Sequence, residues 1–232
     1  MRQPVLAVFT APIPNEVCVA GVYPPLRNDD IQNSASDKVR KEKFCAWKLL
    51  EYAFLQVFGK AMREISFTRL PNGKWVCDFC YFSLSHSENM VAVALSNAPV
   101  GVDIEKISPI KNQERVAKKI LTETEFAEYA RLGVSSPSAT EFLLEVWTKK
   151  ESLFKLGSVD DNEQSGVPSG FIPRRISAFA DCATTKRITA QDGEYFLSVA
   201  SGAVCNTAKK GETSPIGIEN LANFYENPLF LA

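Results

Sequence analysis

The sequence predicts an α+β fold, and two kinds of apolar pattern lead to this prediction. Residues 36–58 and 139–156 carry apolar side chains at helical spacing over several turns. Residues 4–9, 17–22 and 100–105 are short apolar or alternating runs bounded by turn-forming residues, which is typical of strands. No exact repeat relates the segments to one another. The periodicity therefore indicates a mixture of helices and strands and no finer class.

Composition places the chain among ordinary globular proteins. It has 232 residues, of which 45% are hydrophobic, so there is enough apolar material for a sizeable core. A net charge of −1 predicts no general attraction to nucleic acid or to acidic membranes. No apolar run approaches the ~20 residues of a membrane span, and the first residues lack the pattern of a signal peptide. We therefore expect a cytoplasmic protein that binds anions through local clusters and has no nucleic acid or membrane as partner.

The first long helix is predicted from its ends as well as its period. Pro24-Pro25 and the polar stretch of residues 28–36 indicate a loop. Ser36 and Asp37 are both suitable N-caps, and Gly59 is a suitable stop. The first turns between these signals are strongly basic, and the continuation is apolar. A basic run of this kind is usually a solvated helix face.

Shorter elements are predicted on either side of the centre of the chain. Residues 64–82 indicate short strands around a turn at residues 71–74. Residues 112–120 indicate a helix, and Thr122 begins another helix in which Glu125 completes a capping box.

The region after the second long helix divides into three parts. Residues 160–173 are rich in Gly, Pro, Ser and acids, which predicts a long surface loop. Residues 174–180 and 194–200 indicate closing strands, and the tail past residue 208 has no clear pattern.

Residues 100–105 bring two carboxylates together. In a strand, Asp103 and Glu105 point to one face and the apolar residues between them to the other. Two such carboxylates repel each other unless a cation lies between them or water screens them. Oxygen ligands of this kind suit Mg²⁺. A solvated edge strand explains the same pattern, and the hexapeptide alone leaves both interpretations open.

A second polar pattern lies on the helix predicted over residues 139–156. Trp147, Glu151 and Lys155 are spaced i, i+4, i+8 and therefore share one helix face. An exposed Glu–Lys pair beside a buried tryptophan would give the same pattern. Such a pair contributes about 0.3–0.5 kcal/mol and has no functional meaning.

Six cysteines are scattered along the chain, and Cys77 and Cys80 form its lone C-x-x-C pattern. A zinc site there would need further ligands, and His86 is the only histidine. We expect structural or free thiols, because a cytosolic chain normally keeps its thiols reduced.

Three motifs in register resemble those of a known family. They are Phe-Ser-Leu-Ser-His-Ser at residues 82–87, Gly-Val-Asp-Ile-Glu at 101–105, and Trp-Thr-Lys-Lys-Glu-Ser-Leu-Phe-Lys at 147–155. In order and spacing they resemble the 4′-phosphopantetheinyl transferases of the larger surfactin-synthetase-activating, Sfp-like type. The resemblance extends loosely from about residue 36 to about residue 200. Ser83 departs from the family, which usually has Asn there, and this puts a local backbone-organising hydrogen bond in doubt.

The resemblance implies a fold and an activity. The expected fold is a pseudo-twofold arrangement of two similar halves, residues 1–108 and 109–232, with the active site at their interface. The expected reaction is Mg²⁺-dependent transfer of the 4′-phosphopantetheine arm of coenzyme A to a serine of an apo acyl or peptidyl carrier protein, with release of 3′,5′-ADP. Such an enzyme would act as a monomer in fatty acid or secondary metabolite biosynthesis and bind its carrier transiently. The alternative is a non-catalytic coenzyme A or carrier-protein binding module of the same fold.

The resemblance also implies roles for individual residues. The metal ligands would be Asp103, Glu105 and Glu151, and the catalytic residues would be Glu151, Lys155 and Glu125. Coenzyme A would be bound by Arg40, Lys48, Lys74, Ser85, His86, Lys150 and Lys155. Three of these interpretations have ordinary alternatives: the basic helix can be a solvated face, Lys74 a turn lysine, and Glu125 a capping-box residue.

Overall fold

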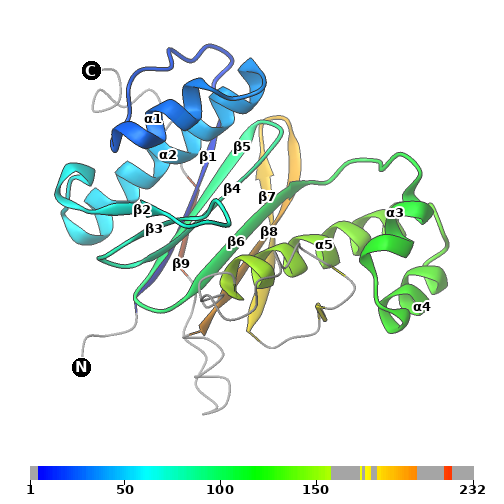
Figure 1. Ribbon diagram of the computed structural model, residues 1–232. Coiled ribbons are helices and arrows are strands. Elements are labelled where there is room, and N and C mark those ends of the chain that lie inside the picture. The colour runs from blue at the N-terminus through cyan, green and yellow to red at the C-terminus, as the bar shows by residue number, and fades with distance from the viewer. Residues whose placement is uncertain (1–4, 158–172, 174–175, 179–181, 203–216, 221–232) are drawn as a thin grey trace. The chain divides into compact units, whose positions relative to one another are not determined.

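Helices and strands follow one another along the chain without a regular order, which agrees with the predicted α+β class (Figure 1). Within the chain, residues 1–98 and 215–232 form one compact unit, and residues 99–214 form a second. The computed structural model describes residues 5–157, 173, 176–178, 182–202 and 217–220.

The first unit is built on a sheet with the strand order β4-β5-β1-β9. Neighbouring strands are antiparallel except for β1 and β9, which are parallel. A separate two-stranded hairpin, β2-β3, encloses the predicted turn at residues 71–74 and confirms it. The strand bounds are β1 Leu6–Pro12, β2 Phe67–Arg69, β3 Trp75–Cys77, β4 Tyr81–Ser87, β5 Met90–Ser96 and β9 Gly217–Asn220.

Helix α2 (Asp37–Phe58) packs against β5 and β4 in this unit. Ser36 is its N-cap, and the Ser36 side chain accepts a hydrogen bond from the Val39 backbone N–H. Gly59 ends the helix in the left-handed region, with φ 64°. Both predicted ends of the helix are therefore confirmed.

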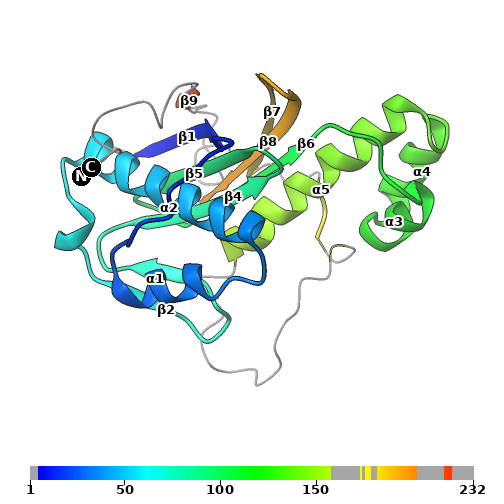
Figure 2. The same cartoon turned by 90° about the horizontal axis from the view of Figure 1, so that it is seen from above.

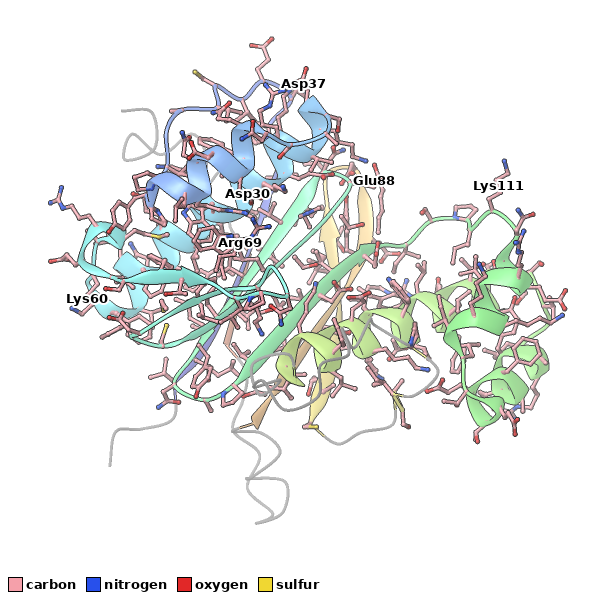
Figure 3. The ribbon with its side chains drawn as sticks, in the orientation of Figure 1. Asp30, Asp37, Lys60, Arg69, Glu88 and Lys111 are labelled. Atoms are coloured by element: carbon pink, nitrogen blue, oxygen red, sulfur yellow. The ribbon has the colours of Figure 1, made fainter. Side chains whose placement is uncertain are left out.

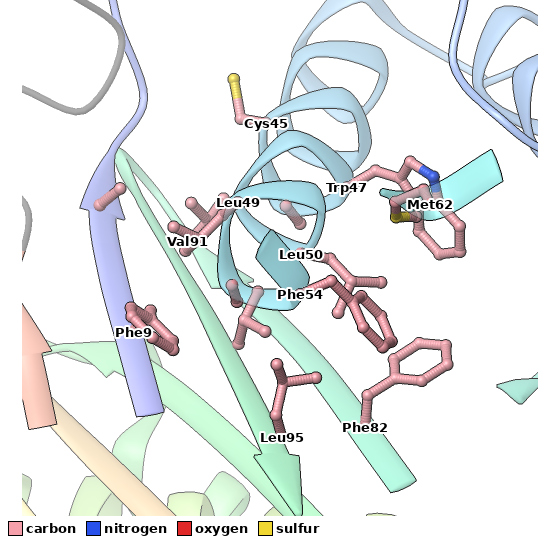
Figure 4. Packing of buried hydrophobic residues seen from close by; sticks show 14 of the residues in the cluster. Phe9, Cys45, Trp47, Leu49, Leu50, Phe54, Met62, Phe82, Val91 and Leu95 are labelled. Carbon is pink, nitrogen blue, oxygen red and sulfur yellow. The ribbon is translucent and has the colours of Figure 1, made fainter. Parts of the chain in front are cut away.

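The core of the first unit lies between α2 and the sheet, and Figure 4 shows part of its packing. Aromatic rings pack against one another in this core: Trp47 and Phe54 both contact Phe82, at centroid distances of 6.1 and 6.4 Å. Leu50 and Leu95 are fully buried in the same cluster. Apolar side chains of the strands pack here against the apolar face of α2, and together they form one core.

Two predictions for the first unit were wrong. Residues 25–32 form helix α1 (Pro25–Gln32) and not a loop, because Pro25 occupies a first-turn position where its missing N–H costs nothing. The low apolar content of this helix hid its period, although Ile31 is completely buried. Residues 17–22 form no strand; Val17 and Val19 pack as partly buried side chains against the core without joining a sheet.

A 3₁₀ helix, η1 (Met62–Glu64), follows α2.

The second unit contains an antiparallel sheet with the order β6-β8-β7 and a long helix, α5, packed against it (Figure 2). The capping box predicted for α4 is present, since the Thr122 hydroxyl accepts from the Glu125 N–H and the Glu125 carboxylate accepts from the Thr122 N–H. The bounds are β6 Val100–Lys106, α3 Gln113–Ile120, α4 Glu123–Arg131, α5 Pro137–Gly157, β7 Ala183–Ala190 and β8 Gly193–Ser201.

The closing region matches the predictions only in part. Strand β8 confirms the strand predicted at residues 194–200. Of residues 174–180, only 176–178 are described, and they are not in a strand. The loop predicted at 160–173 lies outside the described residues except for residue 173. Among the described helices, none is both long and apolar enough to span a membrane.

The predicted boundary between residues 108 and 109 stays a prediction, and the two compact units separate at another place in the sequence. The division falls between residues 98 and 99, because β6 pairs with β8 and packs against α5. The chain also returns to the first unit near its end, where β9 pairs with β1. The predicted pseudo-twofold relation between the two halves stays a prediction.

Candidate active site

In the second unit, β6 and α5 lie in direct contact at Gly101. A Cβ atom built on Gly101 would lie 1.9 Å from the Ser152 backbone oxygen and 2.6 Å from the Leu156 nitrogen. Only glycine therefore allows the helix to approach this closely. Since strand side chains alternate, the face that Gly101 turns to α5 is also the face of Asp103 and Glu105. The acidic pair consequently faces the helix.

Lys155 of α5 contacts the first member of the acidic pair. Its ammonium nitrogen lies 2.8 Å from Asp103 Oδ1 and 3.1 Å from the Val102 backbone oxygen. Asp103 is buried, and the Lys155 side chain is 26% exposed. The lysine thus remains accessible to a ligand while it neutralises a buried carboxylate.

Trp147 of the same helix face contacts the second member. Its indole Nε1–H donates to Glu105 Oε1 at 3.3 Å. Lys155 contacts Asp103 and Trp147 contacts Glu105, so the helix and the strand run in opposite directions at this contact. Glu151 lies midway between Trp147 and Lys155 on the helix. The predicted stripe and the predicted acidic strand face each other.

The surroundings of Glu151 change its pKa strongly. The pKa of Glu151 is raised to about 7. Burial is the largest cause, the positive charge of Lys155 opposes it, and the negative charges of Asp103 and Glu105 add to the increase. Asp103 and Glu105 are therefore close enough to influence the protonation of Glu151, and Lys155 lies near the same carboxyl. A negative cluster of this kind attracts an additional cation.

The donor set of this group suits a hard divalent cation. In the described part of the chain, no three His, Cys, Asp or Glu side chains are already arranged as a metal site. Asp103, Glu105 and Glu151 nevertheless supply only carboxylate oxygens, which Mg²⁺ prefers. Burial is the largest cause of the raised pKa of Glu151, and the negative charges of Asp103 and Glu105 add to it. By chemistry and charge these residues fit Mg²⁺.

Glu125 and Lys150 form a separate, completely buried ion pair in the second unit. Their side chains have no exposed surface, and Lys150 Nζ lies 2.5 Å from Glu125 Oε2. Lys150 also donates to the Ile120 carbonyl, and Glu125 accepts from the backbone N–H groups of Thr122 and Ala178. The pair ties the start of α4, the end of α3 and α5 together.

The protonation of Glu125 follows from these contacts. Burial raises the pKa of Glu125, but hydrogen bonds from Lys150, the Ala178 N–H and the Thr122 N–H outweigh burial and lower it overall. The carboxylate is therefore charged and fully occupied by donors. In this conformation neither Glu125 nor Lys150 is accessible to coenzyme A or to a carrier serine.

In the first unit, Ser85 and His86 lie on β4, and α2 supplies a partner for the histidine. His86 Nδ1 lies 3.3 Å from Glu42 Oε2. The Glu42 side chain is 7% exposed and the His86 side chain 39% exposed, so a buried acid supports a partly exposed imidazole. Burial raises the pKa of Glu42, Lys38 lowers it, and Glu88 raises it. Glu88, labelled in Figure 3, also pairs with Lys38.

The remaining predicted ligands in this unit make local contacts. Arg40 pairs with Asp37 at 2.6 Å and Lys48 with Glu51 at 2.6 Å, both within α2. Lys74 lies in the β2-β3 turn, where its backbone N–H donates to Asn72 Oδ1. All three side chains are half-buried, and the structure leaves both interpretations of each open.

The sequence-based predictions missed two features. Asp30 gathers three cations, Arg27, Lys43 and Arg69, and Figure 3 labels Asp30 and Arg69. This cluster was hidden because its residues come from α1, α2 and the β2-β3 hairpin. Gly101 was quoted as part of a motif, but its role was missed because only the packed helix reveals it.

Comparison with known protein families gives a match that lies within the second unit. A family model described as the 4′-phosphopantetheinyl transferase superfamily matches residues 99–202. Residues 99–202 are thus similar in sequence to the 4′-phosphopantetheinyl transferase superfamily. The matched range begins just before β6 and ends just after β8, and it includes both the acidic group and the buried ion pair.

Curated members of the superfamily agree with this assignment. The chain is 35% identical over 108 residues to 4′-phosphopantetheinyl transferase gsp of Aneurinibacillus migulanus, covering 46% of this chain and 44% of the relative. It is 33% identical over 75 residues to 4′-phosphopantetheinyl transferase Sfp of Bacillus subtilis, covering 32% of each chain. It is 30% identical over 113 residues to 4′-phosphopantetheinyl transferase psf-1 of Bacillus pumilus, covering 47% and 46%. The chain thus spans less than half the length of these relatives.

Proposed function

We propose that the protein is a 4′-phosphopantetheinyl transferase that moves the phosphopantetheine arm of coenzyme A to a serine of an apo acyl or peptidyl carrier protein. The observation that carries the proposal is the group formed by Asp103, Glu105, Glu151 and Lys155. It lies within the range that matches the superfamily, and it combines three carboxyl groups with a partly exposed lysine. The names of the relatives support the same reaction class.

In the proposed reaction, the second unit acts at the pyrophosphate. Phosphoryl transfer depends mainly on positioning and on neutralising charge. Asp103, Glu105 and Glu151 would hold Mg²⁺, which when bound supplies a Lewis acid and a template for phosphate oxygens. Lys155 would exchange part of its contact with Asp103 for a phosphate oxygen, where its charge stabilises the 3′,5′-ADP that leaves.

The first unit supplies the proposed ligands of the nucleotide end of coenzyme A. His86 is the strongest of them, because the imidazole is partly exposed and Glu42 contacts its Nδ1 atom. In the proposed complex an imidazolium would donate Nδ1–H to Glu42 and Nε2–H to a phosphate oxygen. Ser85, Arg40, Lys48 and Lys74 complete the proposed set.

We do not extend the proposal to Glu125 and Lys150. Their side chains are inaccessible and each has several polar partners, so a role in holding α4 and α5 together accounts for both. The sequence-based expectation that Glu125 acts on the carrier serine and that Lys150 binds coenzyme A would require this pair to open.

The proposal is tested by incubating the protein with coenzyme A, Mg²⁺ and an apo carrier protein, and by measuring the intact mass of the carrier. The expected result is a gain of one phosphopantetheine, which disappears when EDTA replaces Mg²⁺. The alternative, a non-catalytic module of the same fold, predicts coenzyme A binding by calorimetry with no gain in carrier mass. Absence of both binding and transfer with several carriers would refute both functions.

A further inference from the structure

The lone C-x-x-C pattern joins two strands of the first unit and is not part of the proposed reaction. Cys77 is the last residue of β3, and Cys80 directly precedes β4. The Cys77 thiol donates to the Cys80 carbonyl oxygen at 3.1 Å, and both cysteines are free and only partly buried. Two thiols thus lie side by side where a small reagent can reach them.

The residues between the two cysteines are fixed on both sides. Asp78 exchanges two hydrogen bonds with the Ser66 backbone, each 3.3 Å long. Phe79 packs edge-on against Phe58 at a centroid distance of 5.0 Å, and the ammonium of Lys60, labelled in Figure 3, lies 5.0 Å from the Phe79 ring centroid. Because these contacts anchor Asp78 and Phe79, the backbone between the two cysteines is fixed and keeps Cys77 and Cys80 close together.

From this geometry we infer that Cys77 and Cys80 form a redox-active dithiol that small-molecule disulfides oxidise to an intramolecular disulfide. The Cys77 thiolate attacks one sulfur of the oxidant, for example glutathione disulfide, and one glutathione thiolate leaves. The Cys80 thiolate then attacks the Cys77 sulfur of the mixed disulfide, and the second glutathione leaves. The protein loses two protons and two electrons, and one glutathione disulfide becomes two glutathione molecules.

The electrostatics of the pair supports this order of events. When Cys77 is ionised its sulfur is instead the acceptor of a hydrogen bond from the Cys80 thiol, and this is the largest cause that lowers the pKa of Cys77 to about 7. A large share of Cys77 is therefore thiolate near neutral pH. The hydrogen bond with Cys77 and burial raise the pKa of Cys80. Once Cys77 is in the mixed disulfide, its effect on Cys80 is removed, and Cys80 can ionise and resolve the adduct.

The test uses the full chain incubated at pH 7 with a series of glutathione to glutathione disulfide ratios. After acid quenching, the remaining thiols are alkylated and the peptides are analysed by mass spectrometry. We expect a peptide linking Cys77 to Cys80 that has lost two hydrogen atoms and takes up no alkylating reagent. Cys18, which is free and exposed, should show only the glutathione adduct.

Two variants complete the design. Cys80→Ala should stop at a glutathione adduct on Cys77, and the pH midpoint of Cys77 alkylation should move from about 7 towards about 8.5. Cys77→Ala should leave Cys80 largely unmodified. The inference is overturned if wild-type Cys77 and Cys80 keep both thiols, or if Cys77 retains a stable glutathione adduct, under conditions that fully modify Cys18.

Discussion

The two long helices, α2 in the first unit and α5 in the second, are almost equal in length but bury different chemistry. Helix α2 has 22 residues, and apart from Glu42 its buried side chains are apolar. Helix α5 has 21 residues and buries Thr148, Lys150 and Ser152 among its apolar residues. A helix that only packed on its sheet would gain nothing from a buried lysine, because desolvating a charge is costly.

The difference indicates what each helix contributes. Packing of α2 stabilises the first unit mainly through apolar contacts, and its one buried acid contacts His86. Packing of α5 is organised by polar contacts on two sides: Lys155 and Trp147 reach the acidic strand, and Lys150 reaches Glu125. Helix α5 therefore buries more polar side chains than α2, and the same helix carries the residues that contact the acidic strand.

The largest expected effect concerns the buried pair of α5. Lys150→Met should lower the free energy of unfolding by about 3–5 kcal/mol, because it leaves Glu125 buried without its cation. The double variant Glu125→Leu/Lys150→Met should recover much of this loss, since it removes both charges. Urea unfolding measures both. A loss below about 1 kcal/mol in the single variant would show that the pair does not hold α4 and α5 together.

The same pair predicts a pH dependence that apolar packing in α2 lacks. The pKa of Glu125 is lowered in the folded state, so its contribution is present above the unfolded pKa and is lost as pH falls through the folded value. The destabilisation caused by Glu125→Gln should therefore shrink as pH falls from about 6 to about 3. Phe54→Ala in α2 is the matched comparison: it should cost about 3–5 kcal/mol with little change over this range. Equal pH dependence in both variants would contradict the distinction.

Next in size is the effect of the partly exposed lysine on turnover. Lys155→Ala should lower kcat by about 10²–10³, because one preorganised charge near the leaving group is lost. Lys155→Arg should recover only part, since a planar guanidinium does not replace a compact ammonium. Lys149→Ala is the control: Lys149 pairs with Glu145 on the same helix and lies off the stripe. Similar modest losses in Lys149→Ala and Lys155→Ala would show that α5 is merely a basic surface.

Close contact between β6 and α5 predicts a further loss. Gly101→Ala should destabilise the protein by about 1–3 kcal/mol and reduce transfer, because the new methyl group collides with the helix backbone at Ser152. Gly157→Ala is the matched control at the end of α5, where an added Cβ meets no atom within 4 Å. Thermal unfolding and the carrier-mass assay measure the two effects. Equal behaviour of the two variants would mean that α5 can shift without cost.

The smallest expected effect concerns Glu42, the buried acid of α2, and its partner His86. His86→Ala should weaken coenzyme A binding more than it lowers kcat at saturation. Glu42→Gln should weaken binding by about fivefold, since it replaces a charged hydrogen-bond acceptor with a neutral one. Calorimetry measures affinity, and NMR titration of the only histidine shows directly whether its environment has changed. Unchanged affinity in both variants would leave Glu42 and His86 with a structural role only.

Much of the local structure could be predicted from the sequence, because the signals involved act over a few residues. The strand at residues 100–105, the capping box at Thr122 and the stop at Gly59 all depend on neighbours in the chain, and the structure confirms each. The acidic pair and the stripe through Glu151 could also be predicted, since strand and helix periods determine which side chains share a face.

Tertiary packing decided what those faces meet. Lys149 and Lys150 are adjacent in the sequence, yet Lys149 pairs near the surface while Lys150 is fully buried against Glu125. Helix period places the two on different faces, but only the packing of α4 determines which face is internal. Likewise, β9 joins β1 across more than 200 residues, and no local pattern encodes that pairing. Contacts between distant segments depend on the assembled core, and for that reason only the tertiary structure could reveal them.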